Sequence, residues 1–291
     1  MHDDALRDLV RVRAEHPERI AAAAATRRRR PLLGPTGRLM LIAADHPARG
    51  ALAVRDRRLA MASRRDLLDR LLVALSRPGV DGVLATAELA EDLLLLGALD
   101  GKVVIGSMNR GGVGGTAFEF DDRFTAYDAD AIAAANLDGG KLLLRIDPTD
   151  RASADTLEAS GRAVSTLAAR GLMAMIEPFW VRRDSAGTPV NDLSPDAMIR
   201  AISIAQGLGT TSAYTWLKVP VVAEMERVME ASTLPALLLG GDPSRAPDET
   251  YATWRKALQL PTVLGLVVGR TLLYPPGDDV AAAVDTAVSL L

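Results

Sequence analysis

The chain contains no cysteine and only three histidines. The absence of cysteine excludes disulfides, thiol catalysis and thiolate metal sites, and it suits a reducing cytoplasm. Because His2 and His16 both fall in the N-terminal region, a three-histidine zinc site is not predicted. We therefore expect neither a metal nor another cofactor. Magnesium bound by carboxylates stays open as an alternative, although Asp121 and Asp122 are more simply explained as turn-capping residues.

Strong net charge and long apolar segments are also lacking. The formal net charge is -3, so neither nucleic acid nor a membrane surface is expected as a partner. The N-terminus has no apolar signal segment, and the alanine run 21–25 is too short to cross a bilayer. With 48% hydrophobic and 24% charged residues, the 291-residue chain has the balance of a soluble globular protein, and we expect it in the cytoplasm.

The N-terminal region predicts one helix from about Asp4 to Thr26. Four arginines, 27–30, follow it, and since cations favour a helix C-terminus they indicate a solvated helix end rather than a nucleic-acid patch. After Gly37, short runs of Val, Ile, Leu and Met alternate with helical stretches, which predicts parallel strands joined by crossover helices. The predicted strands span residues 39–44, 82–86, 103–107, 142–147, 172–177, 214–219, 236–240 and 263–269.

Eight strands in this arrangement predict an α/β fold, a closed (β/α)8 TIM barrel, rather than an open doubly wound sheet. The first strand–helix turn has no Rossmann fingerprint, and the glycine-rich stretch 111–115 lacks the final glycine and the helix of a dinucleotide motif. We interpret that stretch as a mobile loop. The expected division is an N-terminal helical extension over residues 1–37 and a barrel over residues 38–291.

A lysine in an apolar strand is the main chemical signal. The only lysines are Lys102, Lys141, Lys218 and Lys256, and Lys218 lies within the otherwise apolar sixth strand. Burial lowers the pKa of a lysine and leaves part of it as a free amine that can attack a carbonyl. The rival, Lys141, is discounted because two glycines before it place it at the start of the fourth strand, toward the barrel's stability face. Lys218 is therefore the predicted nucleophile.

Polar groups follow most of the predicted strands, and in this fold active groups lie at the C-terminal ends of strands. Asp45 and Glu177 are the predicted proton-transfer residues, with a buried ion network to nearby arginines as the alternative. His46 is a substrate-binding candidate or a hydrogen-bonded scaffold residue. The other substrate-binding candidates are Asn109, Arg110, Arg145 and Asp147.

The loops after the seventh and eighth strands carry a second signal. Gly240 and Gly241 follow the seventh strand, and Gly269 and Arg270 follow the eighth. Barrels commonly bind phosphate there, because glycines let backbone N–H groups approach and an arginine adds a charge-assisted clamp. The alternative is that the glycines only form tight turns and Arg270 pairs with a neighbouring helix.

From about Leu39 onward, the chain resembles the class I aldolase superfamily that includes deoxyribose-phosphate aldolase and tagatose-bisphosphate aldolase. The resemblance is strongest in the segments 41–46, 140–147, 177–178 and 216–220, with 269–270 as support. It implies that Lys218 forms a Schiff base beside Asp45, and that Gly240, Gly241, Gly269 and Arg270 bind substrate phosphate. Arg145-Ile146 stands where tagatose-type members have tyrosines, so Arg145 is expected to bind a carboxylate or second phosphate.

The sequence thus predicts a metal-independent class I aldolase that acts on a phosphorylated sugar or sugar acid through an imine on Lys218. One alternative is a metal-assisted sugar-phosphate isomerase or enolate enzyme that uses Asp45 and Glu177. Another is a sugar-phosphate-binding barrel without catalysis. The segment 109–127 is long for a strand–helix loop and is expected to cover the site or to make a subunit contact. We expect a homo-oligomer.

Overall fold

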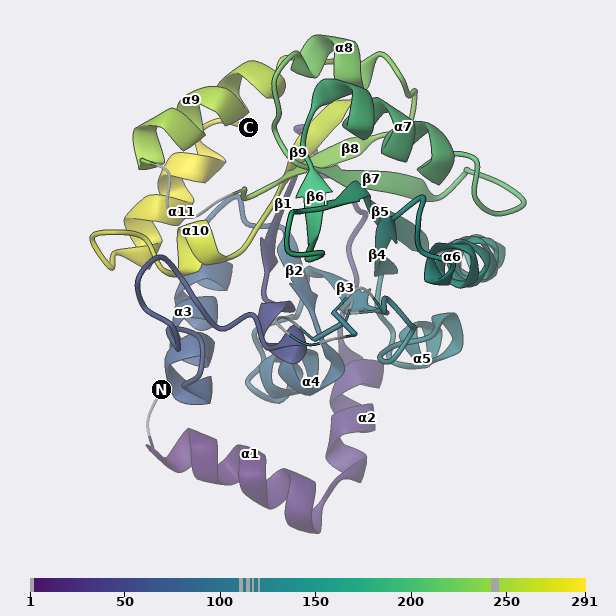
Figure 1. Ribbon diagram of the computed structural model, residues 1–291. Helices are drawn as coiled ribbons and strands as arrows, with labels where there is room; N and C mark the ends of the chain where they lie inside the picture. The colour runs from purple at the N-terminus through teal and green to yellow at the C-terminus, as the bar shows by residue number, and fades with distance from the viewer. Residues whose placement is uncertain (1–2, 110–111, 114–115, 117, 120, 242–245) are drawn as a thin grey trace.

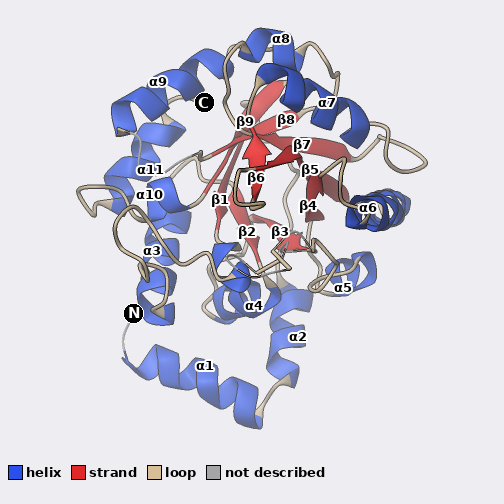
Figure 2. Ribbon diagram, viewed as in Figure 1, coloured by secondary structure: helices blue, strands red, loops and turns tan. Residues whose placement is uncertain are grey.

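Eight parallel strands close into a barrel, which confirms the predicted TIM fold. The computed structural model describes residues 3–109, 112–113, 116, 118–119, 121–241 and 246–291. Neighbouring barrel strands follow chain order, β9 pairs with β1, and helices surround the strands (Figures 1 and 2). The barrel strands are β1 (Leu39–Ala43), β2 (Gly82–Ala85), β3 (Val103–Ser107), β4 (Gly139–Ile146), β5 (Met173–Arg183), β7 (Thr215–Val219), β8 (Ala236–Leu239) and β9 (Val263–Val268).

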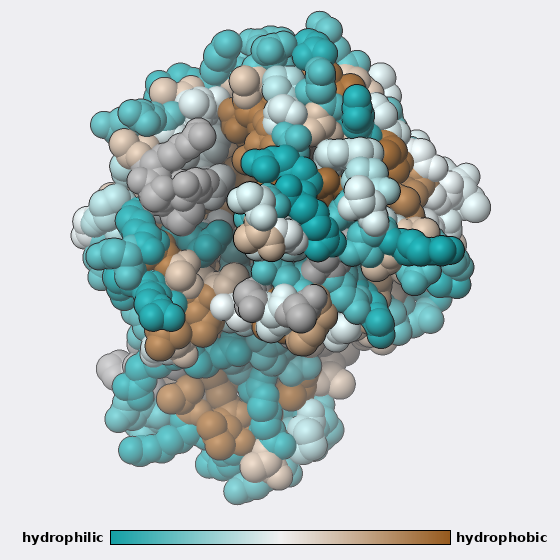
Figure 3. All heavy atoms as spheres, in the orientation of Figure 1, coloured by the Kyte–Doolittle hydropathy of each residue, from teal (hydrophilic) through white to brown (hydrophobic). Residues whose placement is uncertain are grey.

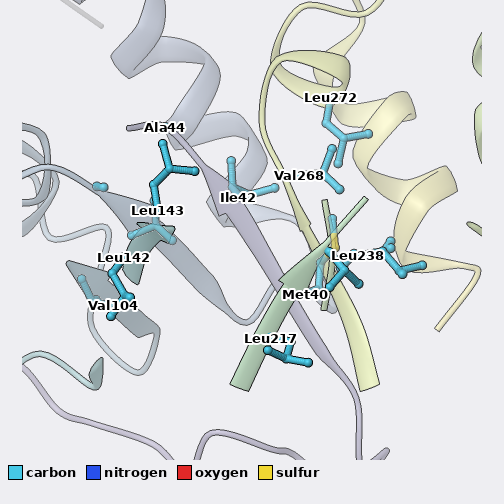
Figure 4. Packing of buried hydrophobic residues seen from close by; sticks show 14 of the residues in the cluster. Met40, Ile42, Ala44, Val104, Leu142, Leu143, Leu217, Leu238, Val268 and Leu272 are labelled. Atoms are coloured by element: carbon cyan, nitrogen blue, oxygen red, sulfur yellow. The ribbon is translucent and has the colours of Figure 1, made fainter. Parts of the chain in front are cut away.

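Alternation along each strand divides the core into two layers, because successive side chains of a strand point to opposite faces. In β1, Leu39, Leu41 and Ala43 belong to the cluster inside the barrel. Met40 and Ile42 belong to the larger cluster between strands and helices, which Figure 4 shows. Continuing each inward row toward the C-terminal end of its strand leads to the polar residues of the barrel mouth.

Helices and one short 3-10 helix, η1 (His46–Arg49), fill the connections. No helix in the described ranges is long and apolar enough to span a membrane. Figure 3 shows a mostly hydrophilic face, with an apolar patch over α1, where Val10 is 62% exposed. The barrel helices are α3 (Arg64–Ser76), α4 (Ala87–Leu95), α5 (Ala129–Ala134), α6 (Ala152–Ala169), α7 (Pro195–Ala205), α8 (Met225–Met229), α9 (Pro247–Ala257), α10 (Arg270–Leu273) and α11 (Val280–Val288).

The N-terminal region forms two helices, α1 (Asp3–Glu15) and α2 (Glu18–Thr26), where one continuous helix was predicted. The break falls at Pro17, which directly precedes α2; proline lacks an N–H and clashes with the preceding turn of a helix. Helix α2 packs against α4, below the barrel in Figure 1.

The prediction of a solvated arginine cluster is wrong for Arg27 but holds for Arg28 and Arg29, which are exposed. Arg27 is buried, its Nη2 lies 3.0 Å from Asp138 Oδ2, and its Nη1 donates to the carbonyl of Lys102. Arg29 Nε also contacts Asp138, at 2.7 Å. These partners directly precede β3 and β4, so the arginines fasten the N-terminal segment to the end of the barrel opposite the carboxyl ends of its strands.

An antiparallel strand, β6 (Pro189–Asp192), was not predicted. Strand β5 pairs with β4 as far as Trp180, and β6 folds back on the last four residues of β5 to form a hairpin. Arg183 holds the hairpin through Nε to Asp147 Oδ2 at 2.9 Å and through Nη2 to Asp150 Oδ2 at 2.8 Å. The hairpin forms part of the wall of the barrel mouth.

Candidate active site

A cavity of about 320 Å³ opens at the C-terminal ends of the barrel strands. Residues from β1, β4, β5, β7, β8 and β9 contribute to its wall, together with the β5–β6 hairpin and the loop that follows β3. The sequence-predicted residues that line this cavity are Asp45, His46, Arg145, Glu177, Lys218, Gly240, Gly241, Gly269 and Arg270. The structure therefore brings most of the predicted site together.

A chain of alternating charges occupies the floor. Lys218 Nζ lies 3.0 Å from Glu177 Oε1, and Lys141 Nζ lies 2.6 Å from Glu177 Oε2. Lys141 Nζ also lies 3.3 Å from Asp45 Oδ2, which accepts a hydrogen bond from Ser107 Oγ at 3.2 Å. All five side chains are buried. Two lysines and two carboxylates thus form one buried network, the arrangement that sequence analysis kept as the alternative, although with lysine rather than arginine as partner.

The two lysines differ in electrostatic environment. Burial lowers the pKa of Lys218 below its ordinary value, and the positive charge of Lys141 lowers it further, against the opposing pull of Glu177. Burial would also lower the pKa of Lys141, but Asp45 and Glu177 both act on it, and the net shift is upward. Lys141 is therefore a permanent cation, and Lys218 is the amine that can lose its proton.

The carboxylates stay ionised. Burial alone would raise the pKa of Glu177, but Lys141 and Lys218 outweigh it and hold the pKa at about 2. The same two lysines outweigh burial at Asp45 and keep its pKa well below the ordinary range. Both groups are therefore in the ionised form that a proton acceptor needs, but their low pKa makes them weak bases at neutral pH.

Sequence reasoning placed Lys141 wrongly, toward the stability face of the barrel, whereas the residue lines the cavity. Strand β4 begins at Gly139, three residues before the predicted start, so Lys141 lies within the strand and pairs with Ser107 and Met175. Its row in β4 continues through Leu143 and Arg145, both of which line the cavity. This two-residue periodicity was the signal in the sequence that could have placed Lys141 inside.

His46 lies beside the network. Its Nδ1 is buried without a hydrogen-bond partner among the described residues and lies 4.0 Å from Asp45 Oδ1. Burial lowers the pKa of His46 to about 4, against the pull of Asp45. The imidazole is therefore neutral at pH 7, and because Nδ1 is buried, only Nε2 is left to bind a molecule in the cavity, as donor or as acceptor.

The predicted phosphate loops form one side of the cavity. Gly241 has φ +66°, a conformation that favours glycine, so a tight turn is part of its role. A Cβ at Gly269 would lie 2.3 Å from the carbonyl oxygen of Ala43, so only glycine fits that approach to β1. Arg270 lines the cavity and donates through Nη1 to the carbonyl of Ala53. Residues 242–245 of the first loop lie outside the described residues.

Two predicted substrate-binding residues, Asn109 and Asp147, do not line the cavity and are bound within the protein. Asn109 is buried and uses its amide on the backbone of Leu143 and Asp122. Asp147 is not among the lining residues and binds Thr149 and Arg183. Arg110 lies outside the described residues, as does part of the glycine-rich stretch 111–115.

Arg145 lines the cavity but forms a buried ion pair. Its Nε lies 2.8 Å from Asp122 Oδ2 and its Nη2 lies 2.6 Å from Asp122 Oδ1, while Nη2 also donates to the carbonyl of Glu119. Asp122 was predicted to cap a turn and instead anchors the long segment after β3. Glu119, from that segment, lines the cavity, as do Arg49 and Asn191. Sequence reasoning missed these three, because none lies at the end of a predicted strand.

The part of the chain that the structure describes contains no group of three or more His, Cys, Asp or Glu residues arranged to hold a metal ion.

Solved structures with this fold include Schiff-base aldolases. An archaeal fructose 1,6-bisphosphate aldolase has a TM-score of 0.65 at 17% identity, covering 93% of this chain and 98% of that one. A structure described as a Schiff base forming fructose-1,6-bisphosphate aldolase has a TM-score of 0.66 at 16% identity, covering 93% of this chain and 99% of that one. At these identities the likeness establishes the fold, which resembles that of class I fructose-bisphosphate aldolases.

A much nearer likeness is Cgl0159 from Corynebacterium glutamicum (Brevibacterium flavum). Its crystal structure shares 53% identity and a TM-score of 0.96 with this chain, covering 100% of this chain and 97% of that one. Among curated proteins, none matches the chain. The Cgl0159-like family model matches residues 37–288, which include all the barrel strands and every residue of the buried charge network. The chain belongs to the Cgl0159-like family.

Proposed function

We propose that the protein is a class I aldolase, a carbon–carbon lyase that forms a Schiff base between Lys218 and the carbonyl carbon of a phosphorylated sugar or sugar acid. The observation that carries the proposal is a buried lysine whose pKa is lowered, 3.0 Å from an ionised carboxylate and next to a second, permanently charged lysine. Structural neighbours described as Schiff-base aldolases support it.

The geometry favours Lys218 over Lys141 as the nucleophile. An amine must be unprotonated to attack a carbonyl, and a positive neighbour promotes the loss of its proton. Lys141 is held between Asp45 and Glu177, at 3.3 and 2.6 Å, which favours its ammonium form. Lys218 contacts only the shared Glu177 among these carboxylates. Lys141 therefore supplies charge, and Lys218 supplies the electron pair.

The steps follow from these groups. The free amine of Lys218 attacks the carbonyl carbon, the carbinolamine loses water, and the resulting iminium accepts the electron pair of the bond between the α- and β-carbons. A carboxylate, Asp45 or Glu177, takes the proton of the hydroxyl on the β-carbon as that bond breaks, and the first product leaves as an aldehyde. The enamine that remains is protonated at carbon, and water releases the second product from Lys218.

Substrate phosphate would bind at the glycine loops. Gly240, Gly241 and Gly269 leave the backbone accessible, and Arg270 can add a charge-assisted contact. The neutral His46 lies between these loops and Asp45 and is suited to a substrate hydroxyl. Phosphate binding on this side would place the carbonyl carbon over Lys218.

Borohydride trapping with peptide mass mapping tests the proposal. A phosphorylated ketose or aldehyde plus borohydride should produce a reduced adduct on the peptide that contains Lys218, and Lys218→Ala should abolish it. Lys256→Met is the matched control, because Lys256 is exposed and pairs only with Glu226. No adduct, or one on Lys141, would refute the assignment. Activity that survives Lys218→Ala and is lost with a chelator would indicate the metal-assisted alternative, and phosphosugar binding without turnover would indicate a binding protein.

Three expectations from the sequence stay predictions: the division at residue 37, a homo-oligomeric state and a cytoplasmic location.

A further inference from the structure

The wall of the cavity on the side of the β3 loop carries two arginines with different bonding. Arg145 directs both Nε and Nη2 to Asp122 and the backbone of Glu119, so its guanidinium is held as part of the wall. The sequence-based role for Arg145, binding of a carboxylate or second phosphate, would require it to leave a buried partner. Breaking a buried ion pair in this way is strongly unfavourable.

Arg49 is the second arginine and is placed differently. It is the last residue of η1, four residues after Asp45, and it is half-buried at the edge of the cavity. Within the described ranges, no carboxylate or carbonyl accepts a hydrogen bond from its guanidinium. Its charge acts on Asp122, whose oxygens are already bound by Arg145. Arg49 therefore adds to the cavity wall a guanidinium that forms no hydrogen bond with the described residues.

The cavity wall thus carries two further cations, Arg49 and Arg270. The charge of Arg270 acts on His46, beside the glycine loops, whereas that of Arg49 acts on Asp122, beside the loop after β3. Lys218 lines the same cavity as both arginines. One bound molecule can therefore contact the reactive amine and both cations, and each arginine can bind an oxyanion.

We propose that Arg49 binds a second oxyanion of the substrate, distinct from the group bound at Arg270. The substrate class is a sugar chain with an anion at each end, either a phosphorylated sugar acid or a sugar bisphosphate. This inference rests on the proposed function for the position of the carbonyl, and it assigns to Arg49 the role that the sequence suggested for Arg145.

The test measures binding of unreactive analogues by calorimetry. The probes are a hexitol monophosphate, a hexitol bisphosphate and a hexonic acid phosphate, none of which has a carbonyl that can form an imine. The wild-type protein should bind one or both doubly anionic probes about ten- to a hundredfold more tightly than the monophosphate, as expected for one added charge-assisted contact. The comparison of the two identifies the oxyanion as phosphate or carboxylate.

Substitution then assigns the preference to a residue. Arg49→Ala should remove the difference between doubly and singly anionic probes, while Arg58→Ala, which deletes an exposed arginine outside the cavity wall on the same segment, should preserve it. Equal binding of all three probes by the wild-type protein, or an unchanged preference in Arg49→Ala, overturns the inference. The wild-type protein could prefer the doubly anionic probes and lose this preference in Arg49→Ala, yet form no Lys218 adduct in borohydride trapping. That result would overturn the proposed aldolase activity and leave the assignment of Arg49 intact.

Discussion

Replacing Lys141 by methionine should slow imine formation at Lys218 without touching the nucleophile. The two ammonium groups contact opposite oxygens of Glu177, at 2.6 and 3.0 Å. Cations placed in this way lie on the order of 5 Å apart, and at an effective dielectric constant of about 20 their repulsion is about 3 kcal/mol, or roughly two pKa units. Lys141→Met removes that repulsion and leaves the two negative charges of Glu177 and Asp45 to act on Lys218 alone. The lost repulsion and the unshared attraction both raise the pKa of Lys218.

The sign of the pH effect follows directly. Lys218 reacts as the free amine, which predominates above its pKa, so a higher pKa moves the reactive range to higher pH. At neutral pH the free fraction falls about tenfold for each pKa unit, and trapping should slow by roughly a hundredfold for the two units worked out above. Raising the pH should restore the rate in Lys141→Met.

The assay is the rate of reductive trapping by cyanoborohydride at saturating carbonyl substrate, measured from neutral to alkaline pH. Lys256→Met serves as the matched control, since that lysine pairs with Glu226 on the surface. A pH–rate profile of Lys141→Met that coincides with that of the control would refute the reasoning. So would a rate that stays low at every pH, because that outcome would mean that Lys141 has a role other than shifting the pKa of Lys218.

Two further predictions concern the stability of the site. The pKa of Glu177 is about 2, below its ordinary value of 4.5. At pH values above 4.5, the ionised Glu177 therefore adds roughly 3 kcal/mol to the free energy of unfolding, and this contribution is lost as the pH falls toward 2. Urea unfolding should show a shallower acid dependence in Glu177→Gln, and an unchanged slope would contradict the pKa. Asp122→Asn and Arg145→Met should each lower the free energy of unfolding by about 3–5 kcal/mol, because each leaves a buried charge unpaired. The double variant should lose less than the sum, whereas strictly additive losses would show that the pair is not coupled.

The barrel was predictable because its signal repeats. Each parallel strand is buried on both faces and forms a short apolar run, and eight such runs at similar spacing leave few other folds. The predicted strand 103–107 agrees with β3 at both ends. The hairpin strand β6 was not predicted, because its four residues, Pro189–Asp192, are only partly buried or exposed and carry no apolar run.

Lys141 and Arg145 show where sequence reasoning reached its limit. The start of β4 was set at the first leucine, yet two glycines and a lysine precede it in the strand, because Asp45 and Glu177 compensate for the burial of Lys141. The partner of Arg145 is Asp122, 23 residues earlier. No local sequence pattern reveals an ion pair between residues so far apart. The position of Arg145 at the end of a predicted strand therefore could not show whether it binds substrate or holds the structure.

The arginines at the start of the barrel also affect how the chain folds. Arg27 and Asp138 are separated by 111 residues, and Arg29 binds the same carboxylate. During synthesis, Arg27 and Arg29 cannot reach Asp138 until β3 and the turn before β4 have emerged from the ribosome, although α2 can already pack against α4. Contacts this distant in sequence slow folding, because a long loop must close before they form. The first segment of this protein to be made therefore reaches its full set of contacts only after the first three barrel strands have been made.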